Sequence, residues 1–173
     1  MEIINGFLGQ QEFAKLQTLV MASDKTEGFQ HILWGYNDVI VDNNDIDKFQ
    51  FVHIFYSDDV PFSPFLEKLN PMLDRIQATS LWRIKANLHT RTPNIIENKF
   101  HVDMLAVPEE KLKHWTTSIF YINTNNGYTE FEDGTKVESV ANRMVTFPSN
   151  LKHRGTSCTD EKTRVVINFN YFR

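Results

Sequence analysis

The amino-acid sequence predicts a mainly β domain, built as a sandwich, barrel or jelly roll and preceded by supporting helices. Apolar residues recur at helical spacing within the first 78 residues, whereas from Ser80 onward they alternate with polar ones. Asn-Gly and Asp-Gly pairs separate several short apolar runs in the second half. Fourteen phenylalanines among 173 residues favour a packed, β-rich interior.

Two helices are expected in the first half of the chain. Apolar positions at helical spacing predict an amphipathic helix over residues 9–22 and a second over residues 64–76. Pro64 suits the first turn of the second helix, and Pro71 should kink that helix or split it in two. The segment DNNDID at 42–47 is expected to be an exposed loop, because it lacks the glycine and closing glutamate of a calcium-binding EF-hand loop.

The second half is expected to consist of short strands. The segment that starts at Ser80 alternates apolar and polar residues up to His89, which predicts a half-buried strand. Further strands are expected at 98–105, 116–123, 127–132, 135–140, 142–147, 151–157 and 163–171. We therefore expect a single domain over 1–173, with helical support in 1–78 and a β core in 79–173.

Composition and charge narrow the functional classes. The single cysteine, Cys158, excludes an internal disulfide and is compatible with a reducing compartment. The opening MEIINGFLGQQEF has no signal-peptide pattern and no apolar run is long enough for a bilayer, so a cytoplasmic protein without membrane contact is expected. A net charge of −4 without any Lys/Arg-rich run gives no support for nucleic-acid binding.

Three residues have the character of metal ligands. In a strand, His101 and Asp103 would point to the same side and could reach one ion, with His153 supplied by a neighbouring strand. Two imidazoles and one carboxylate suit Fe(II) and leave coordination positions open. The alternative is that His153 is a surface histidine at the start of a strand.

Arg164 opens the largely apolar strand RVVINFNYF, where an unpaired buried cation would be costly. A bidentate carboxylate, from the protein or from a ligand, would explain a guanidinium there. The alternative is that Arg164 is the exposed first residue of the strand. His31, His53 and His114 have no ligand-type neighbours and are expected to be structural or exposed.

Four stretches, taken in order, resemble a known family. They are FHVDM, TSIFYINTNNGYTEFEDG, NRMVTFPSNLKHRGTS and RVVINFNYF. Together they resemble the Fe(II)/2-oxoglutarate-dependent oxygenases, specifically the prolyl 4-hydroxylase-like group, over roughly residues 80–172. The early segment INGFLGQQEFAKL is similar to the opening of that group. The resemblance implies a double-stranded β-helix, a jelly-roll variant, with helices supporting one sheet.

The resemblance also implies a site and a reaction. His101, Asp103 and His153 would ligate Fe(II), and Arg164 would pair with the C5 carboxylate of the cosubstrate 2-oxoglutarate. Tyr121 matches a family tyrosine that assists the arginine, although it could also be a core aromatic residue. With O2, such an enzyme hydroxylates an unactivated C–H bond and releases succinate and CO2. The expected substrate is a prolyl or other amino-acid side chain in a peptide, a protein or a free amino acid; the oligomeric state stays open.

The sequence departs from the family pattern at two places. Asn126-Gly127 stands where relatives usually have Gly-Gly, which bears on the turn. Relatives often have a tyrosine in the strand before His-x-Asp that contacts the cosubstrate, and this sequence has none there. Asn87 and His89 are the candidates to replace it. The polar loop that follows, at 89–99, is expected to lie near the mouth of the site.

Other functions remain possible from the sequence. A nucleobase demethylase of the same superfamily is disfavoured, because those relatives carry a second, closely spaced arginine after the cosubstrate arginine, whereas here the next arginine after Arg164 is the terminal Arg173. The alternatives from other classes are a non-catalytic cupin-like module that binds a metal or small ligand, and a structural β-sandwich with an incidental His/Asp cluster.

Overall fold

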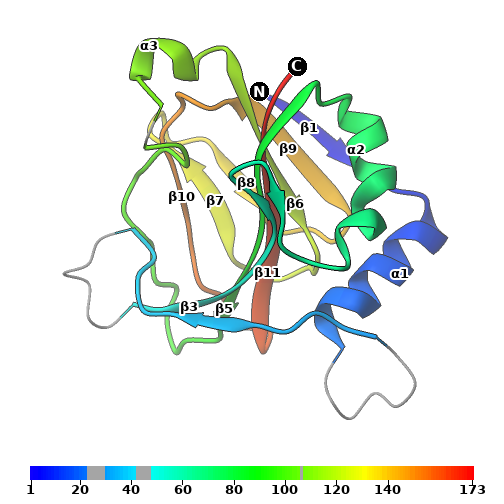
Figure 1. Cartoon of the computed structure of the whole chain (residues 1–173). Helices are drawn as coiled ribbons and strands as arrows, with labels where there is room; N and C mark the ends of the chain where they lie inside the picture. Colours follow the sequence, from blue (N-terminus) through cyan, green and yellow to red (C-terminus); the bar gives the residue numbers. More distant parts are fainter. Residues whose placement is uncertain (23–29, 42–47, 106) are drawn as a thin grey trace.

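The computed structural model describes residues 1–22, 30–41, 48–105 and 107–173, so the expected loop at 42–47 lies outside the described residues. Figure 1 shows two antiparallel sheets, with two helices on one side of the larger sheet. The strands are β1 (Glu2–Asn5), β2 (Gly35–Asn37), β3 (Gln50–Ser57), β4 (Val60–Pro61), β5 (Ser80–Thr90), β6 (Trp115–Tyr121), β7 (Tyr128–Phe131), β8 (Lys136–Glu138), β9 (Arg143–Pro148), β10 (His153–Gly155) and β11 (Thr163–Phe172). The helices are α1 (Gln10–Met21), a 3-10 turn η1 (Leu66–Leu69), α2 (Asn70–Ile76) and α3 (Glu109–Leu112).

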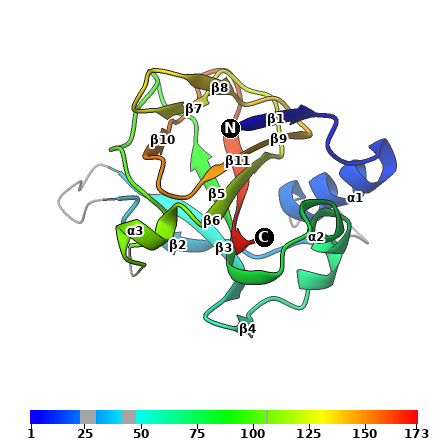
Figure 2. The same cartoon turned by 90° about the horizontal axis from the view of Figure 1, so that it is seen from above.

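The two sheets form the expected jelly roll. The larger sheet has the order β1-β9-β6-β11-β5-β3-β2, with β4 beside β3, and the smaller has the order β10-β7-β8. Figure 2, seen from above, shows the smaller sheet on one side of β6, β11 and β5. A compact apolar cluster that includes Ile119 and Val166 of the larger sheet and Phe131 and Val137 of the smaller one closes the space between them.

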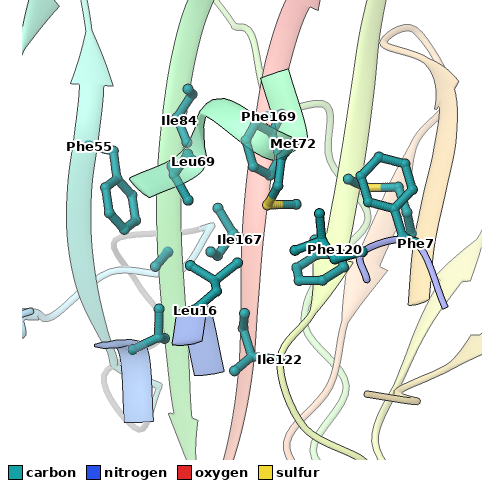
Figure 3. Close-up of a cluster of buried hydrophobic side chains, with 14 of the residues drawn as sticks. Phe7, Leu16, Phe55, Leu69, Met72, Ile84, Phe120, Ile122, Ile167 and Phe169 are labelled. Carbon is teal, nitrogen blue, oxygen red and sulfur yellow. The ribbon is translucent and has the colours of Figure 1, made fainter. Parts of the chain in front are cut away.

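The opposite face of the larger sheet packs against the helices. Figure 3 shows Leu16 of α1 and Met72 of α2 lying over Phe120, Ile167 and neighbouring sheet residues. Because side chains alternate along a strand, the residues between these apolar ones face the other way, toward the smaller sheet. The half-buried strand expected from residue 80 onward is therefore confirmed as β5, with apolar residues toward the helices.

Pro71 divides the second expected helix. The chain forms the 3-10 turn η1 first, and α2 then begins with Pro71 in its first turn. Proline is compatible with that position because the missing N–H would have no intrahelical partner there. No helix among the described residues is long and apolar enough to cross a membrane.

Two expectations about strands were wrong. Residues 98–105 do not form a strand; this segment meets β10 through an isolated bridge between His101 and His153 and through a backbone hydrogen bond from Asn98 to Gly155. The first half of the chain is also not purely helical, because β1, β2, β3 and β4 all join the larger sheet.

Candidate metal centre and carboxylate site

The bridge between His101 and His153 brings two imidazoles together. Each residue donates its backbone N–H to the carbonyl of the other at 3.0 Å, and the ring centroids lie 4.9 Å apart. Asp103 follows after a bend, so a local backbone pairing replaces the strand that the sequence suggested. One ligand atom from each of the three residues lies within 4.8 Å of the others, which is close enough for one ion.

Backbone carbonyls orient both imidazoles. His101 Nδ1 lies 3.1 Å from the Lys99 carbonyl oxygen, and His153 Nδ1 lies 3.2 Å from that of Leu151. A carbonyl can only accept, so each Nδ1 carries the proton and each Nε2 presents a lone pair. The two Nε2 atoms lie 3.9 and 4.0 Å from the Asp103 carboxylate oxygens.

The surroundings of Asp103 hold its carboxylate in the ionised form. Its carboxylate is almost fully buried and accepts a hydrogen bond from Asn170 Nδ2 at 3.0 Å, while Arg83 lies 3.5 Å away. Burial by itself would raise the pKa of Asp103, but the interactions of its carboxylate with the His153 imidazole, the Arg83 guanidinium and the His101 imidazole outweigh burial and hold the pKa well below its usual range. Burial lowers the pKa of His153, which keeps this imidazole neutral and able to ligate.

Arg164 is a buried cation with neutral partners. It is 2% exposed, and it donates from Nε to Ser139 Oγ at 2.8 Å and from a terminal nitrogen to Thr129 Oγ1 at 3.2 Å. Among the described residues no carboxylate lies within 4 Å of this guanidinium, and burial lowers its pKa. A buried cation without an anionic partner is unfavourable, so we expect an anion from outside the protein to bind beside Arg164.

Gly127 leaves the space that Arg164 fills. A Cβ at this position would lie 2.6 Å from Arg164 Cδ and 2.6 Å from the Ser157 carbonyl oxygen. The absence of a side chain at Gly127 is thus required by the arginine, whereas the neighbouring Asn126 points to Thr159 and exchanges hydrogen bonds with it.

Thr129 stands between Tyr121 and the cavity. The Tyr121 hydroxyl donates to Thr129 Oγ1 at 2.8 Å, and its ring lies beneath the Arg164 guanidinium, 5.8 Å from ring centroid to Cζ. Thr129 accepts from both residues, so its own hydroxyl hydrogen remains available for another acceptor. Tyr121 does not line the cavity and Thr129 does. Sequence reasoning missed Thr129, because a threonine within an alternating strand carries no distinguishing signal.

One cavity joins the metal-type cluster to Arg164. It comprises about 490 Å³ of space that is partly open to solvent, and residues of both sheets line it. Asn87 and His89, both considered as substitutes for the missing tyrosine, line it, and His89 lies opposite Arg164 in the β5–β11 ladder. Burial, together with the nearby charges of Arg164 and Lys85, lowers the pKa of His89 to about 3, so its imidazole is neutral.

Ion pairs and a hydrogen bond hold the loop that contains Glu97 and Asn98 beside this cavity. Tyr128 donates to the Glu97 carboxylate at 2.6 Å, and Arg154 bridges Glu97 and Glu130 at 2.6 Å each. Asn98, from the same loop, lines the cavity.

His53 lies elsewhere, on β3, where its ring nitrogens contact the Leu33 carbonyl and the Ser63 hydroxyl.

The fold has well-defined structural neighbours. A prolyl hydroxylase from Trichoplax adhaerens, in complex with a hypoxia inducible factor oxygen degradation domain peptide fragment, is 14% identical with a TM-score of 0.64, covering 99% of this chain and 82% of that one. A prolyl-4-hydroxylase from Pseudomonas putida is 12% identical with a TM-score of 0.56, covering 99% of this chain and 92% of that one. The non-heme alpha ketoglutarate dependent epimerase SnoN from nogalamycin biosynthesis is 13% identical with a TM-score of 0.66, covering 98% of this chain and 75% of that one.

These likenesses show a shared fold: the chain has the jelly roll of prolyl hydroxylases and other 2-oxoglutarate/Fe(II) oxygenases. No protein-family model and no curated protein sequence matches the chain.

Proposed function

We propose that the protein is an Fe(II)- and 2-oxoglutarate-dependent dioxygenase that hydroxylates an unactivated C–H bond. The observation that carries the proposal is the opening of two sites onto one cavity. One holds two oriented imidazoles and an ionised carboxylate; the other holds a buried guanidinium without an anionic partner. This donor set suits Fe(II), and the separate cation suits the far carboxylate of a small diacid.

The residues divide into two groups by role. His101, Asp103 and His153 would hold Fe(II), which when bound supplies the activation of O2 and the oxidative decarboxylation of 2-oxoglutarate to succinate and CO2. Arg164 would bind the C5 carboxylate of 2-oxoglutarate, with the Thr129 hydroxyl as a further donor. Tyr121 acts as a positioning residue, because its hydroxyl reaches the carboxylate only through Thr129.

A polar, narrow cavity serves this chemistry in two ways. The charged groups that line it are largely buried, so they act more strongly on a ligand than they would in water. The neutral His89 offers a hydrogen bond beside Arg164 without adding a second cation, because burial lowers its pKa.

We propose an amino-acid side chain as the hydroxylated group, in a peptide, a protein or as a free amino acid. Support comes from the fold shared with two prolyl hydroxylases, one of them bound to a peptide fragment. Proline itself is favoured by this analogy alone.

A succinate-release screen tests the proposed function. Purified protein is incubated with Fe(II), 2-oxoglutarate, ascorbate and O2 together with peptide pools or free amino acids, and the His153→Ala variant serves as the blank. We expect at least one pool to raise succinate above that blank. Fe(II) and 2-oxoglutarate binding without any succinate would instead indicate a non-catalytic binding module.

A further inference from the structure

Lys85 is a cation in the cavity wall that the proposed reaction does not use. It lies on β5, faces the cavity and is partly buried. Among the described residues no carboxylate lies within 4 Å of its ammonium group, and no hydrogen bond to it is present. Burial, together with repulsion from Arg83, lowers the pKa of Lys85 to about 8. Asp103 partly offsets this effect from a distance.

Two buried amides beside Lys85 have side-chain oxygens without a hydrogen-bond donor. Asn168 is directly opposite Lys85 in the β5–β11 ladder, and Asn87 is the next inward residue on β5. Both side chains are more than nine-tenths buried, and their Oδ1 atoms have no hydrogen-bond partner. Leaving a buried carbonyl oxygen without a donor costs about 1–3 kcal/mol of desolvation free energy, so N–H groups of a ligand would be favourable partners for these two oxygens.

The ladder separates Lys85 and Asn168 from Arg164, the proposed cosubstrate anchor, and Asn87 lies between them. Arg164 pairs with His89, and Lys85 pairs with Asn168, four residues further along both strands. Four residues of a β-strand span about 13 Å. Asn168 lies at the metal end of the cavity, with its amide nitrogen 3.5 Å from the Asp103 carboxylate. Lys85 therefore faces the space beside the metal cluster, away from the position of the C5 carboxylate.

We infer that Lys85 is a specificity-determining residue that binds a carboxylate of the hydroxylated substrate, while Asn87 and Asn168 accept hydrogen bonds from N–H groups of the same substrate molecule. This inference rests on the proposed function and names its substrate class: an acidic amino acid, either free or as a residue within a peptide. Both sources present a carboxylate within a few bonds of N–H donors. A partly buried ammonium group without a counter-ion gains most from a ligand carboxylate.

Matched pairs of acid and amide test this inference. Succinate release is compared for L-aspartate against L-asparagine, L-glutamate against L-glutamine, and blocked peptide pools that contain Asp or Glu against identical pools with Asn or Gln. We expect the acid member of at least one pair to be used at least tenfold more efficiently by kcat/KM. Activity confined to the free amino acids or to the pools identifies which source the site takes.

The variant Lys85→Met shows whether the lysine causes the preference. It should reduce the acid-to-amide ratio to within about twofold, Lys85→Arg should keep a preference for the acid, and Lys113→Met, on the exposed surface, should match the wild type. Binding of 2-oxoglutarate to the Mn(II)-loaded protein is measured by calorimetry in parallel. A more than tenfold loss of 2-oxoglutarate affinity in Lys85→Met would assign the lysine to the cosubstrate and overturn the inference.

The two proposals fail differently. Absence of succinate with every substrate contradicts the proposed function. Succinate formation with equal use of acid and amide members, or with an acid preference that survives in Lys85→Met, leaves the oxygenase in place and overturns only the role of Lys85.

Discussion

Replacing Arg164 by methionine separates cosubstrate binding from folding. In the wild type the guanidinium is buried against neutral hydroxyls, so a bound carboxylate gains a charge-assisted, two-pronged contact there. Loss of this contact should cost about 3 kcal/mol of binding free energy, which raises the Kd for 2-oxoglutarate about a hundredfold. Folding should not suffer equally, because removing an unpaired buried cation relieves a desolvation cost.

Thermal unfolding measures both effects in one experiment. Mn(II) replaces Fe(II) to prevent turnover, and 2-oxoglutarate is added at about 100 times the wild-type Kd, which stabilises the wild type by about 2.7 kcal/mol. For a chain of this size that corresponds to a Tm increase of about 5–11 °C. With a Kd raised a hundredfold, Arg164→Met should gain only about 0.4 kcal/mol, or about 1–2 °C.

The comparison needs a control and has a clear contrary result. Arg75→Met removes an exposed arginine on α2, distant from the cavity, and should keep the full 2-oxoglutarate response. The reasoning is refuted if Arg164→Met responds to 2-oxoglutarate like the wild type. It is also refuted if the ligand-free variant unfolds more than about 10 °C below the wild type, because the arginine would then be a structural residue.

Four further predictions test the site and its support. His153→Ala should abolish stabilisation by Mn(II), since it removes one of three ligands, and a metal-induced Tm shift equal to that of the wild type would contradict the assigned site. Tyr121→Phe should raise the Kd for 2-oxoglutarate about fivefold to tenfold without changing Mn(II) affinity, as calorimetry can show, because one hydrogen bond that orients the carboxylate donors is lost. Gly127→Ala should lower the free energy of unfolding by about 1–3 kcal/mol in urea titrations, because its Cβ would meet two neighbours at 2.6 Å, whereas Gly35→Ala, with its nearest atom at 3.6 Å, should have little effect. His89 has a folded pKa of about 3, below its unfolded value of 6.5, so its contribution to stability is fully present above pH 6.5 and is lost as the pH falls toward 3. Between pH 7 and pH 5 the wild type should lose about 2 kcal/mol more than His89→Gln, and equal losses would show that His89 is not buried as a neutral group.

Much of the second half of the chain could be predicted because its strands alternate cleanly. The pattern from residue 80 onward identified β5 and the faces of its side chains, and the run from Arg164 identified β11. The first half gave weaker signals. In β3 the sequence QFVHIFYS is apolar on both faces, so no alternation distinguishes it, and β1 has four exposed residues at the edge of a sheet.

The convergence of His101, Asp103 and His153 could be predicted, although the backbone conformation expected to produce it was wrong. The sequence suggested that a strand would aim His101 and Asp103 to one side, whereas the structure uses one backbone bridge to His153 and a bend. Thr129 and Lys85 could not be assigned a role from the sequence. Their places beside the cavity depend on strand register, which emerges only when distant segments pair.

The pairing of β5 with β11 sets the spacing of the residues that line the cavity. Inward-facing residues follow one another about every 6.6 Å along a strand, so paired backbone atoms, rather than flexible side chains, set the span between Arg164 and the end of the cavity beside Asp103. Inserting one residue between Arg164 and Asn168 would turn the following side chains toward the helices and put apolar ones in their place. We therefore expect an insertion or deletion in this stretch to disrupt the lining of the cavity.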